Sequence, residues 1–141
     1  MERPLPYEQF DHDADLGLRV RGGTLADLFE NAARGMIELM VDPATVRPER
    51  TVELRATGDD DEMLLVAWLS EVLFALEVDH FAPAEVKMLQ AGDGTARGRL
   101  CGEAFDGARH EARSAVKAVT YHNLEIRRGE GGCEVDIIFD V

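Results

Sequence analysis

The stretch from Met63 to about Glu77 carries apolar residues around most of the circumference of a helix, and this limits what the chain can fold into. A helix with one apolar face can lie on a protein surface, whereas a helix that is apolar on nearly all sides must be covered by other elements. We therefore predict a central core helix. Its expected core residues are Leu64, Leu65, Trp68, Leu69, Val72, Phe74 and Leu76.

A second helix is predicted earlier in the chain, where apolar residues recur at helical spacing between Leu25 and Met40. Thr24 is the expected N-cap, with Asp27 three residues later. An acidic run at residues 59–62 precedes the core helix. Carboxylates are favourable near the positive end of a helix dipole, so we expect this run to cap the helix, with a cation site as the alternative.

Alternating apolar and polar residues predict strands at residues 16–20 and 51–56, and two hairpins in the second half of the chain. The first hairpin turns at residues 92–94, and the second turns at residues 129–132. Two helices with hairpin-linked strands indicate an α+β fold, a two-layer sandwich of a mostly antiparallel or mixed sheet with two main helices. We expect residues 1–141 to form a single domain, because that length suits one core.

The charge balance disfavours several classes of partner. The chain holds 15 Lys and Arg against 28 Asp and Glu, a net charge of −13. An acidic surface repels phosphate, so DNA, RNA at high affinity and anionic membranes are not expected as direct partners. The N-terminus lacks the apolar core of a signal peptide, and Cys101 and Cys133 form no CxxC motif. These features lead us to expect a cytoplasmic protein.

The acidic segment Asp11-His12-Asp13-Ala14-Asp15 is the first candidate site. If the segment is extended, its three Asp residues fall on one side. Carboxylate oxygens suit Ca²⁺, Mg²⁺ or Mn²⁺ rather than zinc. The spacing is not that of an EF-hand, because Leu16 and Gly22 occupy the positions where that loop needs Gly and Glu. The alternative interpretation is an acidic loop leading into a strand.

The C-terminal segment offers further oxygen donors. Asp140 alternates with Phe139, so an inward Phe139 would turn the Asp140 carboxylate outward, next to the oxygen atoms of Val141. The strand is apolar up to its last residue, and we therefore expect it to be paired and fixed in place.

Positive charge is concentrated in residues 97–128, which carry a net charge of +3 against −16 for the remainder. His110 and His122 belong to this segment and are expected to be ordinary hydrogen-bonded histidines, with a role in the site as the alternative. An RNA-binding protein would need this segment to form one exposed basic face. The sequence contains no P-loop, nucleophile elbow or dinucleotide-binding motif.

Several segments, taken together and in order, resemble the archease family over nearly the whole chain. The most specific are the motif at residues 11–17 and Lys117-Ala118-Val119-Thr120-Tyr121-His122. The others are the helix beginning at Thr24, the core segment 64–69, Gly102-Glu103, Arg109-His110 and the terminal Phe139-Asp140-Val141.

This resemblance implies a small cytoplasmic cofactor of the GTP-dependent tRNA-splicing ligase, the enzyme that joins 2′,3′-cyclic-phosphate or 3′-phosphate RNA ends to 5′-hydroxyls. Archeases promote guanylylation and multiple turnover of that ligase, and they are activators rather than enzymes. The expected partner is therefore the RNA ligase, with tRNA contacted only indirectly.

The resemblance also implies a site for a divalent cation, Ca²⁺, Mn²⁺ or Mg²⁺, at Asp15, Asp140 and Val141. His12, Asp13, Lys117 and His122 are the supporting positions. Asp13 departs from the family, which usually has Thr there, and it adds a carboxylate to the site.

Three other functions remain open from the residues. A stand-alone metal-dependent phosphoester hydrolase would use His12 or His122 as its base. A general chaperone or protein-interaction module would not depend on Asp15. A direct RNA-binding protein would depend on residues 97–128 and would bind with a steep salt dependence.

Overall fold

The computed structural model describes residues 5–12 and 15–141. Its elements, in chain order, are β1 Tyr7–His12, β2 Asp15–Gly22, α1 Leu25–Met40, a 3₁₀ turn Pro43–Thr45, β3 Arg50–Thr57, α2 Asp61–Glu77, β4 Phe81–Gly92, β5 Thr95–Ala104, β6 Ala118–Val119, β7 Arg127–Gly129 and β8 Gly132–Asp140. The α+β class is confirmed. Neither helix in the described part of the chain is long and apolar enough to cross a bilayer.

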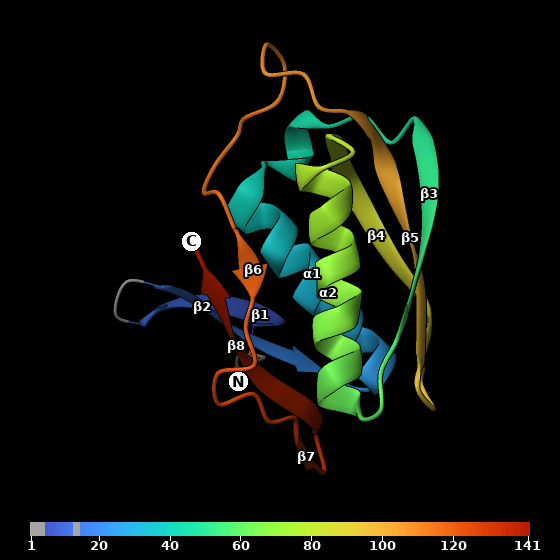
Figure 1. Ribbon diagram of the computed structural model, residues 1–141, viewed down its shortest axis with the longest axis vertical. Coiled ribbons are helices and arrows are strands. Elements are labelled where there is room, and N and C mark those ends of the chain that lie inside the picture. The colour runs from blue at the N-terminus through green and yellow to red at the C-terminus, as the bar shows by residue number, and fades with distance from the viewer. Residues whose placement is uncertain (1–4, 13–14) are drawn as a thin grey trace.

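The strands form two antiparallel sheets, which lie on either side of the helices (Figure 1). One sheet has the order β1-β2-β8-β6, with β7 also paired to β8, and the other has the order β3-β5-β4. The sequence suggested a single sheet. The strands divide into two because α1 packs against both β2 and β4 and so lies between them.

The helix starts follow the sequence closely. The Thr24 hydroxyl accepts a hydrogen bond from the Asp27 backbone N–H over 3.1 Å, as predicted. Asp60 caps α2 in the same way, accepting from the Met63 N–H over 2.7 Å. The acidic run therefore caps the helix, as expected, and Asp61 and Glu62 occupy its first turn.

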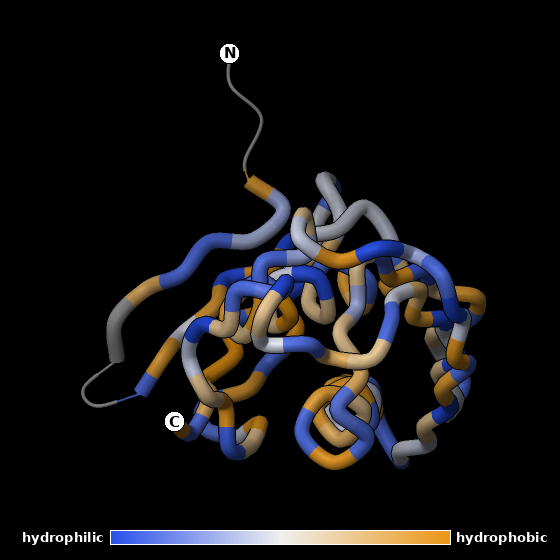
Figure 2. Tube along the Cα trace, turned by 90° about the horizontal axis from the view of Figure 1, so that it is seen from above, coloured by the Kyte–Doolittle hydropathy of each residue, from blue (hydrophilic) through white to orange (hydrophobic). Residues whose placement is uncertain are grey.

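The core forms around α2. Trp68 is fully buried, and its indole Nε1–H donates to the Phe29 carbonyl over 3.1 Å. The prediction for Phe74 is wrong, because its side chain is 53% exposed. Helix α2 is seen end-on at the lower edge of the molecule in Figure 2, with neither sheet beyond it, and Phe74 is one of its residues that solvent reaches. The helix is thus apolar on a face that solvent reaches.

Both predicted hairpins are present. The structure also contains β1, a strand that the sequence pattern did not predict. The first hairpin joins β4 and β5 at residues 92–94, all with positive φ. The second pairs β8 with residues 127–129, whereas the sequence indicated Leu124 and Ile126, which instead pack against the core. The sequence pattern predicted a strand at residues 16–20 but none before it. In the structure, all six residues of β1 pair antiparallel with β2.

The presence of β1 corrects the prediction for the acidic segment. Asp11 pairs with Leu16 and His12 pairs with Asp15, so the chain reverses direction between these residues. Asp11 and Asp15 therefore lie on two antiparallel strands rather than in one extended run. Residues 13 and 14 lie outside the described part of the chain.

Candidate functional site

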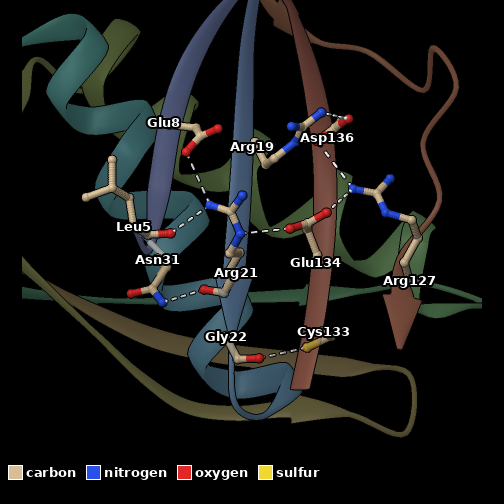
Figure 3. Close-up of polar contacts among 10 residues, drawn as sticks. All are labelled: Leu5, Glu8, Arg19, Arg21, Gly22, Asn31, Arg127, Cys133, Glu134 and Asp136. Carbon is tan, nitrogen blue, oxygen red and sulfur yellow. Dashed lines mark hydrogen bonds and ion pairs between the residues drawn. The ribbon is translucent and has the colours of Figure 1, made fainter. Parts of the chain in front are cut away.

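The outer face of β2 and β8 carries cross-strand pairs of opposite charge (Figure 3). Arg21 lies opposite Glu134 and Arg19 lies opposite Asp136, each joined by a 2.8 Å ion pair. Arg127 on β7 reaches both carboxylates, over 2.8 and 3.4 Å. These guanidinium groups hold the pKa values of Glu134 and Asp136 below their usual range. Each cross-strand pair forms one row of the sheet, and the charges of these two rows are thereby neutralised.

The next row toward the end of β8 is apolar. Gly17 lies opposite Ile138, and the Phe10 ring from β1 lies across Gly17. A Cβ atom at Gly17 would come within 2.4 Å of the Phe10 ring, so glycine is required for this close approach. The Arg19 guanidinium lies 5.8 Å from the centre of the same ring. This row separates the neutralised pairs from the end of the sheet.

The last row brings the two predicted carboxylates together. Leu16 pairs with Phe139, and the same register continued by one residue places Asp15 opposite Asp140. Because the register alternates faces, both Asp residues belong to the outer face, away from the buried Phe139. With the side chains of residues 5–10 and 15–141, neither carboxylate forms an ion pair. Like charges opposite one another destabilise a sheet unless another charge compensates them.

The backbone of Asp140 is fixed from its other side. Its carbonyl accepts a 2.8 Å hydrogen bond from the Lys117 N–H, and Asp140 pairs with Ala118 of β6. Phe139 is completely buried and anchors the strand. The side chains of Asp140 and Val141 remain exposed at the surface. The structure therefore holds the end of the strand in place, as the sequence predicted.

The supporting positions divide into two groups. Lys117 lies next to the site through its backbone, and its side chain is exposed. His122 follows β6, is exposed, and has its N–H directed to the Thr120 hydroxyl over 3.3 Å. Asp13 lies outside the described residues, and of His12 only the backbone is described.

The oxygen donors at this site suit a hard cation, although they are few. Among the residues whose side chains the structure describes, 5–10 and 15–141, no group of three or more His, Cys, Asp or Glu side chains is arranged to hold a metal ion. The register, extended by one residue, places Asp15 opposite Asp140 at this end of the sheet, and Val141 adds backbone oxygen. Oxygen ligands of this kind are those that Ca²⁺, Mg²⁺ and Mn²⁺ prefer. These ions take about six or more ligands, so a bound cation would need further ligands from water or from another molecule.

A buried ionic cluster forms around Glu103, and the sequence gave little indication of it. Glu103 accepts hydrogen bonds from Arg109, from the backbone N–H of Arg47 and from His110 Nε2, and these lower the pKa of Glu103 to about 2. The Nδ1 atom of His110 accepts from the Asp106 N–H over 2.8 Å. His110 must therefore be the neutral Nε2–H tautomer in this arrangement. It is a hydrogen-bonded structural histidine, as expected.

The basic segment 97–128 does not form one basic face, because most of its Arg side chains pair with Asp or Glu side chains from several parts of the chain. Its ion pairs in the described residues are Arg97 and Arg99 with Glu53, Arg109 with Glu103 and Asp106, Arg113 with Asp42 and Glu111, Arg127 with Glu134 and Asp136, and Arg128 with Asp61. These pairs involve different sheets and loops. The requirement for a direct RNA-binding surface is not met by these side chains.

Comparison with known proteins identifies the family. The sequence model of the Archease protein family matches residues 7–141. Protein archease of Methanopyrus kandleri is 39% identical over 140 residues, which is 97% of this chain and 100% of that protein. Protein archease of Saccharolobus islandicus is 35% identical over 136 residues, 96% of this chain and 98% of that protein.

A solved structure agrees with these sequences. The solution structure of protein 1598 of Methanobacterium thermoautotrophicum superposes with a TM-score of 0.75 at 34% identity. The match covers 96% of this chain and 99% of that one. Sequence and fold therefore agree over almost the whole length, and the chain belongs to the archease family.

Proposed function

We propose that this protein is an activator of the GTP-dependent tRNA-splicing ligase, which promotes guanylylation and multiple turnover of that enzyme in the cytoplasm. It has no catalytic activity of its own in this proposal. Membership of the archease family supports the assignment. The observation that carries it is the row in which the strand register places Asp15 opposite Asp140, with no ion pair from either carboxylate to the side chains of residues 5–10 and 15–141.

In this proposal, Asp15, Asp140 and oxygen atoms of Val141 hold a divalent cation, Ca²⁺, Mn²⁺ or Mg²⁺. Asp13, close to Asp15 in the sequence, is a further oxygen donor in this proposal. When bound, the cation supplies positive charge that neutralises phosphate and helps to orient nucleotidyl transfer. The protein's own contribution is to fix the two carboxylates, through the β2–β8 register and the Lys117 N–H bond to Asp140.

The charges around Asp15 and Asp140 favour binding of this end of the sheet to a basic enzyme surface. The rows containing Arg19 and Arg21 are neutralised internally, so they do not offset the exposed carboxylates at the end of the sheet. The net charge of −13 attracts a basic ligase and opposes binding of RNA alone.

A ligation assay with the cognate ligase at limiting concentration tests the proposal. Wild-type protein should increase the number of RNA joints formed per ligase molecule, and Asp15→Ala and Asp140→Ala should abolish most of this increase. Asp59→Ala, which removes an exposed carboxylate from the start of α2, should activate normally. Ligase turnover that wild-type protein leaves unchanged would contradict the proposal, as would phosphoester hydrolysis by the protein without any ligase.

A further inference from the structure

The C-terminal half of α2 exposes an apolar surface that the proposed function does not use. Phe74 and Val78 are separated by one helical turn and are 53% and 54% exposed. Isolated exposed apolar residues are ordinary, but two large ones one turn apart on a helix indicate an interaction surface. The exposed fractions of Phe74 and Val78 show that solvent reaches this side of α2.

A groove of about 250 Å³ lies at the ends of both helices and reaches the last turn of α2 through Leu76 and Glu77. Met40 of α1, Leu76 and Glu77 of α2, and Phe105 are among its lining residues. Phe105 is 40% exposed, and its N–H donates to the His80 carbonyl over 2.7 Å. Phe105 thus supplies an apolar wall of the groove that solvent partly reaches.

The electrostatic character of this end of the molecule is negative. The C-terminal ends of α1 and α2 both border the groove, and neither described helix has a basic residue in its last turn. The negative ends of the two helix dipoles therefore add to exposed acidic side chains. These are Glu71, Glu77 and Asp79.

The two helix ends differ in how their carbonyl groups are satisfied. The Leu39 and Met40 carbonyls of α1 accept hydrogen bonds from the backbone N–H groups of Ser114 and Arg113. In the described part of the chain, no backbone N–H donates to the carbonyls of Leu76 or Glu77. The end of α2 is therefore open to a donor from outside, and cationic side chains are the donors that helix ends favour.

Arg113 is the basic side chain that lines the groove, and it is already neutralised. Its guanidinium pairs with Asp42 and Glu111 over 3.5 and 3.4 Å and donates to the Glu38 carbonyl over 3.0 Å. It therefore leaves the negative potential at the α2 end uncompensated.

We propose that this helix-end surface, defined as Phe74, Val78, Phe105, Glu71, Glu77 and Asp79, is a docking site for a segment of the RNA ligase that carries apolar residues flanked by Lys or Arg. The inference rests on the proposed function, because it takes the ligase as the partner. Apolar side chains of the ligase segment enter the groove and cover Phe74, while its cations meet the α2 carbonyls and the acidic rim. The helix-end surface then holds the ligase, and the Asp15–Asp140 row acts on it.

Affinity for the purified ligase, measured by isothermal titration calorimetry, tests this surface. Phe74→Ser combined with Val78→Ser should weaken binding about tenfold, as loss of central apolar contacts does. Glu77→Lys combined with Asp79→Lys should also weaken binding to the ligase, because it replaces acidic side chains by basic ones. This variant keeps the apolar residues. Met63→Ser, at a 39% exposed position in the first turn of the same helix, is the matched apolar control. Glu130→Lys, at an exposed turn, is the charge control.

The results separate the docking surface from the proposed function. Helix-end variants should activate the ligase fully once their concentration exceeds the weakened Kd, whereas Asp140→Ala should bind like wild type and fail to activate. Wild-type affinity in both helix-end variants, together with normal activation by wild-type protein, would overturn the docking surface and leave the proposed function standing. Absence of any binding or activation by wild-type protein would overturn both.

Discussion

Leu16 on β2 lies directly opposite Phe139 on β8, and this pairing determines where the acidic residues beside them lie. The next position along each strand places Asp15 opposite Asp140, at residues 125 positions apart in the chain. The register therefore brings two separated motifs to the same end of the sheet. Phe139 contributes by burying its side chain completely beneath that site.

Replacement of Phe139 by Ala should destabilise the protein by about 3–5 kcal/mol, because it removes a fully buried aromatic side chain and leaves a cavity. Urea unfolding followed by tryptophan fluorescence measures this loss, since Trp68 is buried in the same core. The exposed Phe105→Ala variant is the matched control and should lose much less. Equal losses for the two variants would show that β8 is not anchored in the core.

Glu103→Gln should remove part of the acid sensitivity of the fold. The pKa of Glu103 is lowered from 4.5 to about 2, chiefly by Arg109, so its stabilising contribution is present above about pH 4.5 and is lost as the pH falls toward about 2. The difference in free energy of unfolding between wild type and Glu103→Gln should therefore be largest near neutral pH and should shrink across that interval.

Urea unfolding curves at a series of pH values between neutrality and about pH 2.5 provide this measurement. Glu130→Gln is the control, because the Glu130 side chain is exposed at a turn. A difference between wild type and Glu103→Gln that stays constant with pH would contradict the lowered pKa of Glu103.

The Arg19–Asp136 pair should contribute modestly to stability. It is bidentate, over 2.8 and 3.1 Å, but the two side chains are 40% and 28% exposed. A double-mutant cycle with Arg19→Met and Asp136→Asn should give a coupling of about 1 kcal/mol or less, which added salt reduces. A coupling of several kcal/mol that salt leaves unchanged would show that this face is less solvated than its exposure indicates.

Local sequence patterns were sufficient to predict most of the fold. Thr24 as a helix cap, the acidic start of α2 and the turn of the β4–β5 hairpin follow from interactions within a few residues. The exposure of Phe74 could not be predicted in this way, because it depends on which side of α2 the two sheets leave uncovered. The separation into two sheets depends likewise on α1 lying between β2 and β4.

The candidate site was predictable in composition but not in arrangement. Asp15 and Asp140 were identifiable as acidic positions at strand ends, whereas their meeting depends on the long-range pairing of β2 with β8. The β1 strand was missed, and with it the reversal of the chain between His12 and Asp15. The hydrogen bonds of the Glu103 cluster could not be predicted from the sequence in full, because one donor, the Arg47 N–H, lies 56 positions away in the chain.

Titration of Ca²⁺ and of Mn²⁺ into wild-type protein, Asp15→Ala and Asp140→Ala tests the central claim most directly. If the two carboxylates share one cation, each substitution should weaken binding about tenfold or more, because each removes a charged oxygen ligand. Asp59→Ala should bind like wild type, since it removes an equal charge at the start of α2. Identical affinities in wild type and both site variants would contradict the claim.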